Sequence, residues 1–325
     1  MQDILALAAA NLLTPMILCF ALGLAAALAR SELSIPEAAA KTMSIYLLFA
    51  IGFKGGVAVN DHGLDGSLLL AILGGVALSF GLPFIAFALL KILTRLSATD
   101  AAAVAAHYGS ISIVTFVTAT SVLQSSGITS EGYIVAVAAA MEAPAIISAL
   151  WLVSRSGRSE PMDADLWREI LLNGSIVLLV GSFLIGLATG AKGMARIDAF
   201  IVAPFQGVLC LFLLDMGLVA GRGLKAARGV LSLGAVAFGI LMPMIGAALG
   251  LTVGLALGLS TGGVALMMVL AASASYIAVP AAMRVALPEA NPSIYLTLSL
   301  GVTFPFNLTL GIPTYVAVAQ MLTGG

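Results

Sequence analysis

Residues 105–116 read AAHYGSISIVTF, and residues 271–280 read AASASYIAVP. Each segment places serines and a residue unfavourable to helix inside a long apolar stretch. Gly109 lowers helix stability by about 1 kcal/mol relative to alanine, and Pro280 removes a backbone donor and clashes with the preceding turn. Non-helical backbone survives in hydrocarbon only where it is buried in protein or lines a cavity. The two segments therefore predict two interrupted membrane helices.

The composition around these segments is typical of a polytopic membrane protein. The chain has 325 residues, of which 61% are hydrophobic and 9% are charged, whereas soluble domains carry about 25% charged residues. A span needs about 20 mostly apolar residues. This rule predicts an all-α protein with ten transmembrane helices, at residues 4–29, 36–60, 66–94, 99–123, 131–154, 169–190, 196–221, 228–257, 261–287 and 293–322. The interrupted segments fall in the fourth and ninth spans.

Motifs of enzymes and of ATP-driven pumps are absent from the sequence. Its two histidines, His62 and His107, are too far apart for an H-E-x-x-H zinc motif, and it has no G-x-x-x-x-G-K-[ST] phosphate loop. The net charge of −1 does not point to nucleic acid. We therefore expect no enzyme activity, no cofactor and no nucleic-acid partner.

Basic residues orient the spans, because lysine and arginine stay on the cytoplasmic side of a membrane. When both termini are placed on the outer side, ten of the fourteen basic residues face the cytoplasm. Lys192 and Arg196 then fall in an outer loop. We expect a multi-pass protein of a bacterial plasma (inner) membrane, surrounded by membrane lipids, with both termini outside.

The two halves of the chain resemble each other. Three pairs of segments recur in the same order, at offsets within 160 to 166 residues: LLFAIGFKGG and LLDMGLVAG, GSIS and ASAS, MEAP and VTFP. Five spans in each half force the second copy to enter the membrane from the opposite side, which is the inverted repeat of many secondary transporters. We expect a first repeat at 1–154, a short cytoplasmic linker at 155–168 and a second repeat at 169–325. Coincidence among Ala/Gly/Leu-rich helices is the alternative.

If both helices break, two half-helix N-termini meet near the middle of the membrane. Their free N–H groups and positive dipole ends would form an anion site. Four serines of the two segments could complete it by satisfying freed backbone groups or by presenting hydroxyls: Ser110, Ser112, Ser273 and Ser275. The alternative is that these small residues only permit close helix packing.

Ionisable residues within the spans are costly and therefore functional candidates. Glu142 lies just before a proline in the fifth span, and we expect it to coordinate a coupling cation or carry a proton. Asp215 has the same standing, or it pairs with Lys54 of the matching helix as a structural contact. His107 precedes the first break and is either hydrogen-bonded structure or part of a substrate or proton path. A ladder of glycines from Gly246 to Gly258 favours helix or protomer packing.

At these residues the chain resembles the sodium-dependent bicarbonate transporter family first associated with cyanobacterial carbon concentration. The matching segments are LLFAIGFKGGVAV, TDAAAVAAHYGSISIVT, MEAPAI and MRVALPEANPSIY, and the likeness covers nearly the whole chain. It implies ten spans, a core domain that moves against a scaffold domain, a homotrimer, and bicarbonate with sodium nearby where the fourth and ninth spans meet. The family is regulated by a small trimeric PII-like protein on the cytoplasmic face, and the short central loop leaves that partner open here.

The resemblance also implies site residues. The substrate-binding positions are Gly109, Ser110, Ile111 and Ser112 of the first break and Ala272, Ser273, Ala274 and Ser275 of the second. The expected ligands of the coupling cation, or carriers of the proton, are Glu142, Ser112, Thr115, Tyr276 and Asn307. Tyr276 stands where cyanobacterial members carry an aspartate implicated in sodium binding, so a hard-cation ligand is lost there. Sodium coupling would rest on Glu142, hydroxyls and backbone carbonyls, or shift to protons, or be gone.

These observations predict a secondary transporter that imports bicarbonate or a similar small anion, coupled to a cation gradient, with sodium as the expected ion. One alternative is a sodium–organic-anion symporter of the bile-acid type, which also has crossed broken helices. The others are a membrane sensor or binding protein with little transport and a passive anion channel.

Overall fold

The computed structural model describes residues 13–63, 66–154, 168, 172, 174–226, 232–276 and 278–324. Within these ranges the protein is helical and contains no strand, as the sequence predicts. The expectations that concern residues 1–12 and most of the linker, residues 155–167, lie outside the described part of the chain.

Eight helices of the described residues are long and apolar enough to cross a membrane, and two further apolar helices, Pro15–Leu28 and Thr261–Ala272, are shorter. A multi-pass membrane protein is therefore confirmed, whereas the ten-span inverted repeat stays a prediction. The helical elements are α2 Pro15–Leu28, α3 Glu37–His62, α4 Gly66–Leu93, α5 Ala98–Gly109, α6 Ile113–Ser125, α7 Ile134–Ala140, α8 Pro144–Ser154, α10 Gly174–Ile201, α11 Phe205–Ala226, α12 Leu233–Ala256, α13 Thr261–Ala272, α14 Ala278–Ala286, α15 Pro292–Leu296, the π-helix η1 Thr297–Thr303, α16 Phe304–Phe306, the π-helix η2 Asn307–Gly311 and α17 Ile312–Thr323.

The helix interruptions lie where the two opening segments predict them. α5 ends at Gly109 and α6 begins at Ile113, and α13 ends at Ala272 before α14 begins at Ala278. The first half of each broken helix also begins in the same way. The Ser97 hydroxyl accepts a hydrogen bond from the Asp100 N–H at 3.0 Å, and the Ser260 hydroxyl accepts one from the Gly263 N–H at 3.1 Å. A serine cap of this kind satisfies one free N–H of the first helical turn.

One expected helix boundary is wrong, and one expected span contains a turn that was not predicted. The predicted span at 196–221 begins at Phe205, because α10 continues to Ile201 after a kink at Gly190. Gly190 has φ 55, a left-handed conformation that ends the straight part of the helix there. The predicted fifth span, 131–154, agrees with the membrane-length segment Ile134–Val153. This segment contains a turn between α7 and α8, because Pro144 cannot continue the hydrogen-bonding of the preceding turn.

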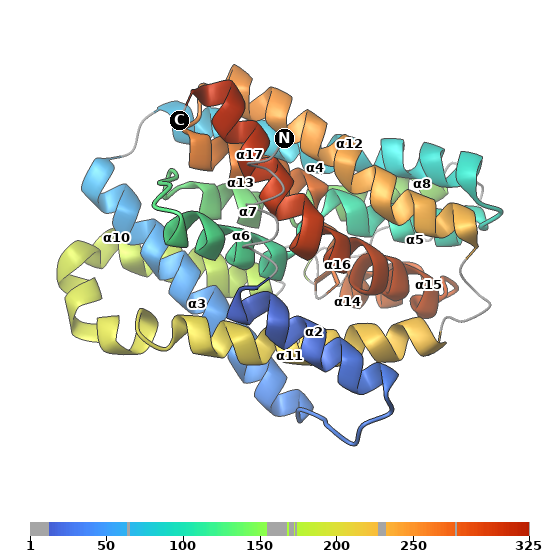
Figure 1. Ribbon diagram of the computed structural model, residues 1–325. Coiled ribbons are helices and arrows are strands. Elements are labelled where there is room, and N and C mark those ends of the chain that lie inside the picture. The colour runs from blue at the N-terminus through green and yellow to red at the C-terminus, as the bar shows by residue number, and fades with distance from the viewer. Residues whose placement is uncertain are drawn as a thin grey trace.

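The helices pack in two layers (Figure 1). One layer, called the wall below, consists of α2, α3, α10 and α11 and occupies the lower left of Figure 1. The other layer, called the bundle below, contains α4 to α8 and α12 to α17 and holds both broken helices. The N- and C-terminal halves of the chain contribute to both layers.

Glycines bring the backbones of the wall helices into contact. α3 packs along α10, where Gly52 and Gly56 lie against the backbone of Leu179 and Phe183. α11 packs along α2, where Gly217 lies against the backbone around Phe20 and Leu24. A side chain at these glycines would collide with main-chain atoms of the partner helix, so the wall is held at the closest helix–helix approach.

The predicted glycine ladder lies inside the bundle. Gly246 and Gly250 of α12 approach the backbone of α13 at Ala271 and Met267, whereas Gly258 has a positive φ after the end of α12 and open space around it. The ladder therefore packs one helix of the chain against the first half of the second broken helix.

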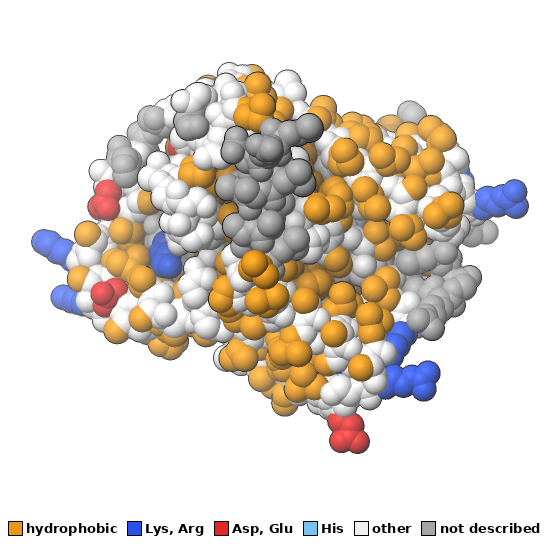
Figure 2. Space-filling model, viewed as in Figure 1, with side chains coloured by type: hydrophobic (Ala, Val, Ile, Leu, Met, Phe, Trp, Pro, Cys, Tyr) orange, Lys and Arg blue, Asp and Glu red, His pale blue; other side chains and the backbone are white. Residues whose placement is uncertain are grey.

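The surface agrees with a lipid environment. Figure 2 shows apolar side chains spread over the middle of one face, with most charged side chains at its margins. Leu69, Leu73 and Phe80 project from α4 and are largely exposed. Exposed apolar residues along membrane-length helices are stable only against lipid or another protein.

Candidate functional site

The two helix breaks cross and are hydrogen-bonded to each other. The Ser275 N–H donates to the carbonyl of His107 at 2.7 Å, and the Ser112 N–H donates to the Ser273 hydroxyl at 2.8 Å. Ser110 and Ser273 have extended backbones, with φ −90 and −83. Each break thus satisfies backbone groups of the other, which is how two non-helical segments can be stable in the interior of a membrane protein.

The described residues of this crossing have almost no exposure. Ser110, Ile111, Ser112, Ser273 and Ser275 are each at most 3% exposed. Gly109 is buried as well, and a side chain on it would reach within 2.7 Å of the Ser79 carbonyl of α4. Ala272 and Ala274 are 1% and 2% exposed. The structure therefore brings all eight sequence-predicted substrate positions together in one buried region.

The second half of each broken helix begins at the crossing. The Ser112 hydroxyl caps α6 by accepting hydrogen bonds from the Thr115 N–H at 3.2 Å and from the Thr115 hydroxyl at 2.9 Å. The N–H groups of Ile113 and Val114, in the first turn of α6, have no carbonyl of their own helix to bond. At α14, the Val279 N–H donates to the Ser275 hydroxyl at 3.4 Å. Two positive helix ends are thus available at the crossing.

Glu142 lies beside the first break. Its carboxylate accepts a hydrogen bond from the Ser110 hydroxyl at 3.0 Å, and the residue is 4% exposed. The turn that carries it, between α7 and α8, is fixed by a hydrogen bond of 2.6 Å from the Ser79 hydroxyl to the Met141 carbonyl. A carboxylate that is buried this deeply must bind a cation, take up a proton or receive further hydrogen bonds.

Two buried polar atoms of the crossing have no hydrogen-bond partner among the described residues. They are Nε2 of His107 and the hydroxyl of Tyr276. His107 Nδ1 lies 2.5 Å from the Ser275 carbonyl. Because a carbonyl can only accept, Nδ1 carries the proton, and Nε2 of the neutral ring is then an unused acceptor. The Tyr276 hydroxyl lies beside Ser112 without the geometry of a hydrogen bond.

The remaining candidates are Asn307 and the suggested pair of Lys54 and Asp215. Asn307 donates to the Ala272 carbonyl at 2.8 Å and accepts from the Tyr315 hydroxyl at 2.9 Å, so both ends of its amide are already bonded. The suggested pair of Lys54 and Asp215 is wrong. The ammonium group of Lys54 lies 4.4 Å from the ring centroid of Phe205, and Asp215 is ten residues further along α11, about 15 Å away at 1.5 Å per residue.

Sequence reasoning missed several residues that support the crossing. Thr303 donates to the Gly239 carbonyl at 2.6 Å and lies 2.6 Å from the Tyr108 hydroxyl. Tyr295 stacks on the His107 ring with 4.6 Å between centroids. One signal in the sequence pointed to Thr303. When the repeated segments MEAP and VTFP are aligned, Thr303 takes the position that corresponds to Glu142.

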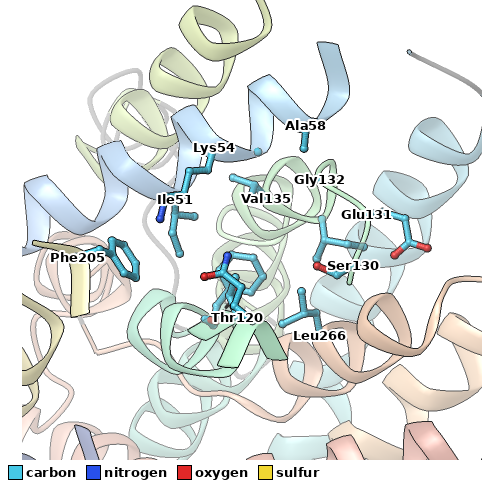
Figure 3. A pocket seen from close by; sticks show the side chains of 14 residues that line it. Ile51, Lys54, Ala58, Thr120, Ser130, Glu131, Gly132, Val135, Phe205 and Leu266 are labelled. Atoms are coloured by element: carbon cyan, nitrogen blue, oxygen red, sulfur yellow. Dashed lines mark hydrogen bonds between the residues drawn. The ribbon is translucent and has the colours of Figure 1, made fainter. Parts of the chain in front are cut away.

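A cleft of about 140 Å³ lies between the wall and the bundle (Figure 3). Lys54 and Ala58 of α3 form one side, and α6 contributes Phe116, Thr120 and Gln124. The rest of its lining consists of Ile51, Gly55, Ser130, Glu131, Gly132, Ile134, Val135, Phe205 and Leu266. Nothing in the sequence pattern predicted this cleft, because its lining comes from five separate elements.

Comparison with known protein families gives a match that covers almost the entire chain. Residues 15–320 match the family model of the Na+-dependent bicarbonate transporter superfamily. The chain belongs to this superfamily. A search of the curated proteins gives no significant match. Membership of this superfamily assigns the chain to membrane transporters, which are not an enzyme class, and points to a small anion as the substrate.

Proposed function

We propose that the protein imports bicarbonate, or a small monovalent anion of similar shape, by secondary active transport coupled to a cation, with sodium as the coupling ion. The observation that carries the proposal is the meeting of two half-helix N-termini, those of α6 and α14, beside two crossed extended segments. Family membership supports the choice of anion and ion. Each helix N-terminus is equivalent to roughly half an elementary positive charge. Two of them suit one monovalent anion.

The anion would be held by donors at the two breaks. The N–H groups at the start of α6 are directed along the helix axis toward the crossing. The hydroxyls of Ser112 and Ser275 are available as donors, whereas those of Ser110 and Ser273 already donate to Glu142 and to the Leu270 carbonyl. The unused acceptor on His107 adds selectivity. Bicarbonate carries one O–H donor, whereas nitrate and chloride carry none, so an unpaired acceptor in the site favours the hydrogen-bearing anion.

Coupling of the anion to a cation follows from the negative charge that Glu142 places beside the proposed anion site. Two like charges 6 Å apart at an effective dielectric of 20 repel by about 3 kcal/mol, which is roughly a hundredfold in affinity. A cation bound between Glu142 and the anion would remove this penalty and make the two ions bind together. Thr115, Tyr276 and Ser112 contribute oxygens near the same break. Asn307 would act indirectly, through the Ala272 carbonyl that it bonds.

A proton on Glu142 would also cancel the repulsion. We propose sodium because the family is described as Na+-dependent and because several hard oxygen donors lie near the carboxylate. The tyrosine at position 276 then leaves Glu142 as the charged ligand of the site.

We also propose the inverted repeat, with repeats at 1–154 and 169–325, the wall as scaffold and the bundle as moving core. Gly52 and Gly56 align with Gly217 and Gly221 in the two halves, and each pair packs against the first described helix of the opposite half. The homotrimer, the bacterial inner membrane, the outer position of both termini and a PII-like regulator are predictions that rest on the family resemblance and on the distribution of basic residues.

Uptake of labelled bicarbonate into proteoliposomes tests the proposal, with an inward sodium gradient and a matched potassium gradient as control. Sodium-driven accumulation is expected. Ser112→Leu and Ser275→Leu should abolish it by filling the crossing, while Ser125→Leu, at an exposed position of α6, should leave it intact. Retained uptake in both crossing variants would refute the site. Flux that follows the anion gradient without accumulation would indicate a channel.

The organic-anion alternative is less compatible with the available space. The cleft between wall and bundle has a volume of about 140 Å³, whereas sites for drug-sized molecules measure about 300–1,000 Å³. Competition by a bile acid against bicarbonate uptake separates the two functions. Displacement by the bile acid would favour the alternative, and saturable bicarbonate binding without flux would favour a sensor.

A further inference from the structure

Lys54 is not part of the crossing of the two helix breaks, and its position calls for another explanation. It lies within α3, a membrane-length helix, eight residues before the helix ends at His62, and its side chain lines the cleft between the wall and the bundle. Its ammonium group contacts the Phe205 ring face. A lysine at this depth is costly and is normally paired with an acid or placed in an ion path.

No carboxylate among the described residues forms an ion pair with Lys54. The one acid in the cleft lining is Glu131, and it is bound elsewhere: the Ser260 N–H donates to it at 2.6 Å and the Ser260 hydroxyl at 3.0 Å. Figure 3 shows the Glu131 carboxylate turned away from the Lys54 side of the cleft. Lys54 therefore has no ion-pair partner among the described residues, and the Glu131 charge lies at the other side of the cleft, held by the Ser260 donors.

Neutral hydrogen-bond donors accompany that charge. Gln124 and Ser130 line the same cleft, and their side chains form no hydrogen bond within the described residues. Thr120 also lines the cleft and donates to the Phe116 carbonyl of its own helix at 2.9 Å. An ammonium group, an amide and a hydroxyl around a space of about 140 Å³ suit a small oxyanion.

One helix, α6, connects the lining of the cleft with the crossing. Ser112, Phe116, Thr120 and Gln124 are spaced four residues apart, so they lie on one face of α6 and its cap. Phe116 is 1% exposed and separates the cleft from the Ser112 end of this face. An anion in the cleft would thus be one aromatic side chain away from the crossing.

We propose that this cleft is a second anion-binding site, in which Lys54 captures the small oxyanion before it reaches the crossing. The inference rests on the proposed function for the identity of the anion. It assigns to Lys54 the role of a binding residue at a loading site, distinct from the helix termini that hold the anion at the crossing.

The test measures anion binding in the cleft without relying on transport. An Ala58→Cys substitution, at a position that lines the cleft and is not one of the proposed donors, is made in a protein with Cys19→Ala and Cys210→Ala, which removes the native thiols. The introduced thiol is labelled with methanethiosulfonate reagents that differ in charge, one anionic sulfonate and one cationic ammonium, and the ratio of their rates reports the local potential. Bicarbonate or gluconate is then added to test for protection.

We expect Lys54→Gln to lower the anionic-to-cationic rate ratio by about tenfold, and Lys192→Gln, at an exposed position of α10, to leave it unchanged. Bicarbonate should slow the anionic reagent when Lys54 is present and lose this effect in Lys54→Gln. Lys54→Arg should retain both. In uptake assays with the native cysteines and Ala58 restored, Lys54→Gln should raise KM by about tenfold with kcat nearly unchanged.

An unchanged rate ratio in Lys54→Gln, or equal protection with and without Lys54, would overturn the proposal. Failure of the proposed function looks different: bicarbonate protection that depends on Lys54, in a protein that accumulates no bicarbonate, would refute transport and support the anion site. Sodium-driven accumulation of bicarbonate, without any protection of the introduced thiol by bicarbonate, would support the proposed transport and overturn the anion site in the cleft.

Discussion

Replacement of Glu142 by glutamine removes one buried charge at nearly constant shape. The amide oxygen can still accept the hydrogen bond that the Ser110 hydroxyl donates at 3.0 Å to the carboxylate. A carboxylate and a bound sodium ion with charges about 4 Å apart attract by about 4 kcal/mol at an effective dielectric of 20. The loss of this attraction corresponds to about a thousandfold in sodium affinity. Because a buried carboxylate also gives up hydration, we expect a measured effect of at least about thirtyfold.

The assay is a sodium titration of labelled bicarbonate uptake into proteoliposomes, with potassium as the replacing cation. For Glu142→Gln the sodium concentration that gives half-maximal uptake should rise by at least about thirtyfold, while thermal stability stays equal or increases. Glu37→Gln, at an exposed position of the first turn of α3, is the matched control and should behave like the unmodified protein. A correctly folded Glu142→Gln protein with the original sodium dependence would refute the role of this carboxylate. If a proton gradient drives uptake and this uptake is lost in Glu142→Gln, the coupling ion is a proton and not sodium.

Two further predictions concern the mechanics of the fold. His107→Ala should lower the free energy of unfolding by about 1–3 kcal/mol, because the Ser275 carbonyl that its ring bonds would be buried without this partner. A thermal melt checks this prediction, and His107→Asn should recover part of the loss. A disulfide between Gly55→Cys and Val135→Cys, whose Cβ atoms would lie 3.0 Å apart, should link wall to bundle and stop uptake until it is reduced. The reduced form of the same double variant is the control and should transport like the unmodified protein, and inhibition that reduction does not reverse would contradict motion between the layers.

The sequence predicted the features that depend on local chemistry. Helix propensity and the proline rule located both breaks, since Gly109 and the Ser-rich segment before Pro280 weaken helix regardless of the surrounding fold. Serine caps and the apolar spans could be recognised for the same reason. The matching order of segments in the two halves indicated that the breaks would be equivalent, and the structure places them against each other.

Features that depend on contacts between distant segments were not predictable in this way. The hydrogen bond from the Ser110 hydroxyl to Glu142 joins residues 32 positions apart, and no pattern in the sequence specifies that approach. The suggested pairing of Lys54 with Asp215 was wrong because the Lys54 ammonium group lies against Phe205, ten residues before Asp215 in α11. The break before Pro144 could have been predicted, because the residue before a proline is disfavoured in helix.

The contacts themselves indicate which parts of the protein move as units. The two breaks are joined by hydrogen bonds between His107 and Ser275 and between Ser112 and Ser273, all of them buried. Opening the crossing internally would expose several polar groups to hydrocarbon, at about 1–3 kcal/mol each. The wall is equally resistant to internal change, because its glycines hold main chain against main chain. The cleft that contains Lys54 lies between these two units. Under the proposed function, access to the anion site would therefore be cheapest if the bundle shifted as one body along the wall, and both half-helix termini would then move together.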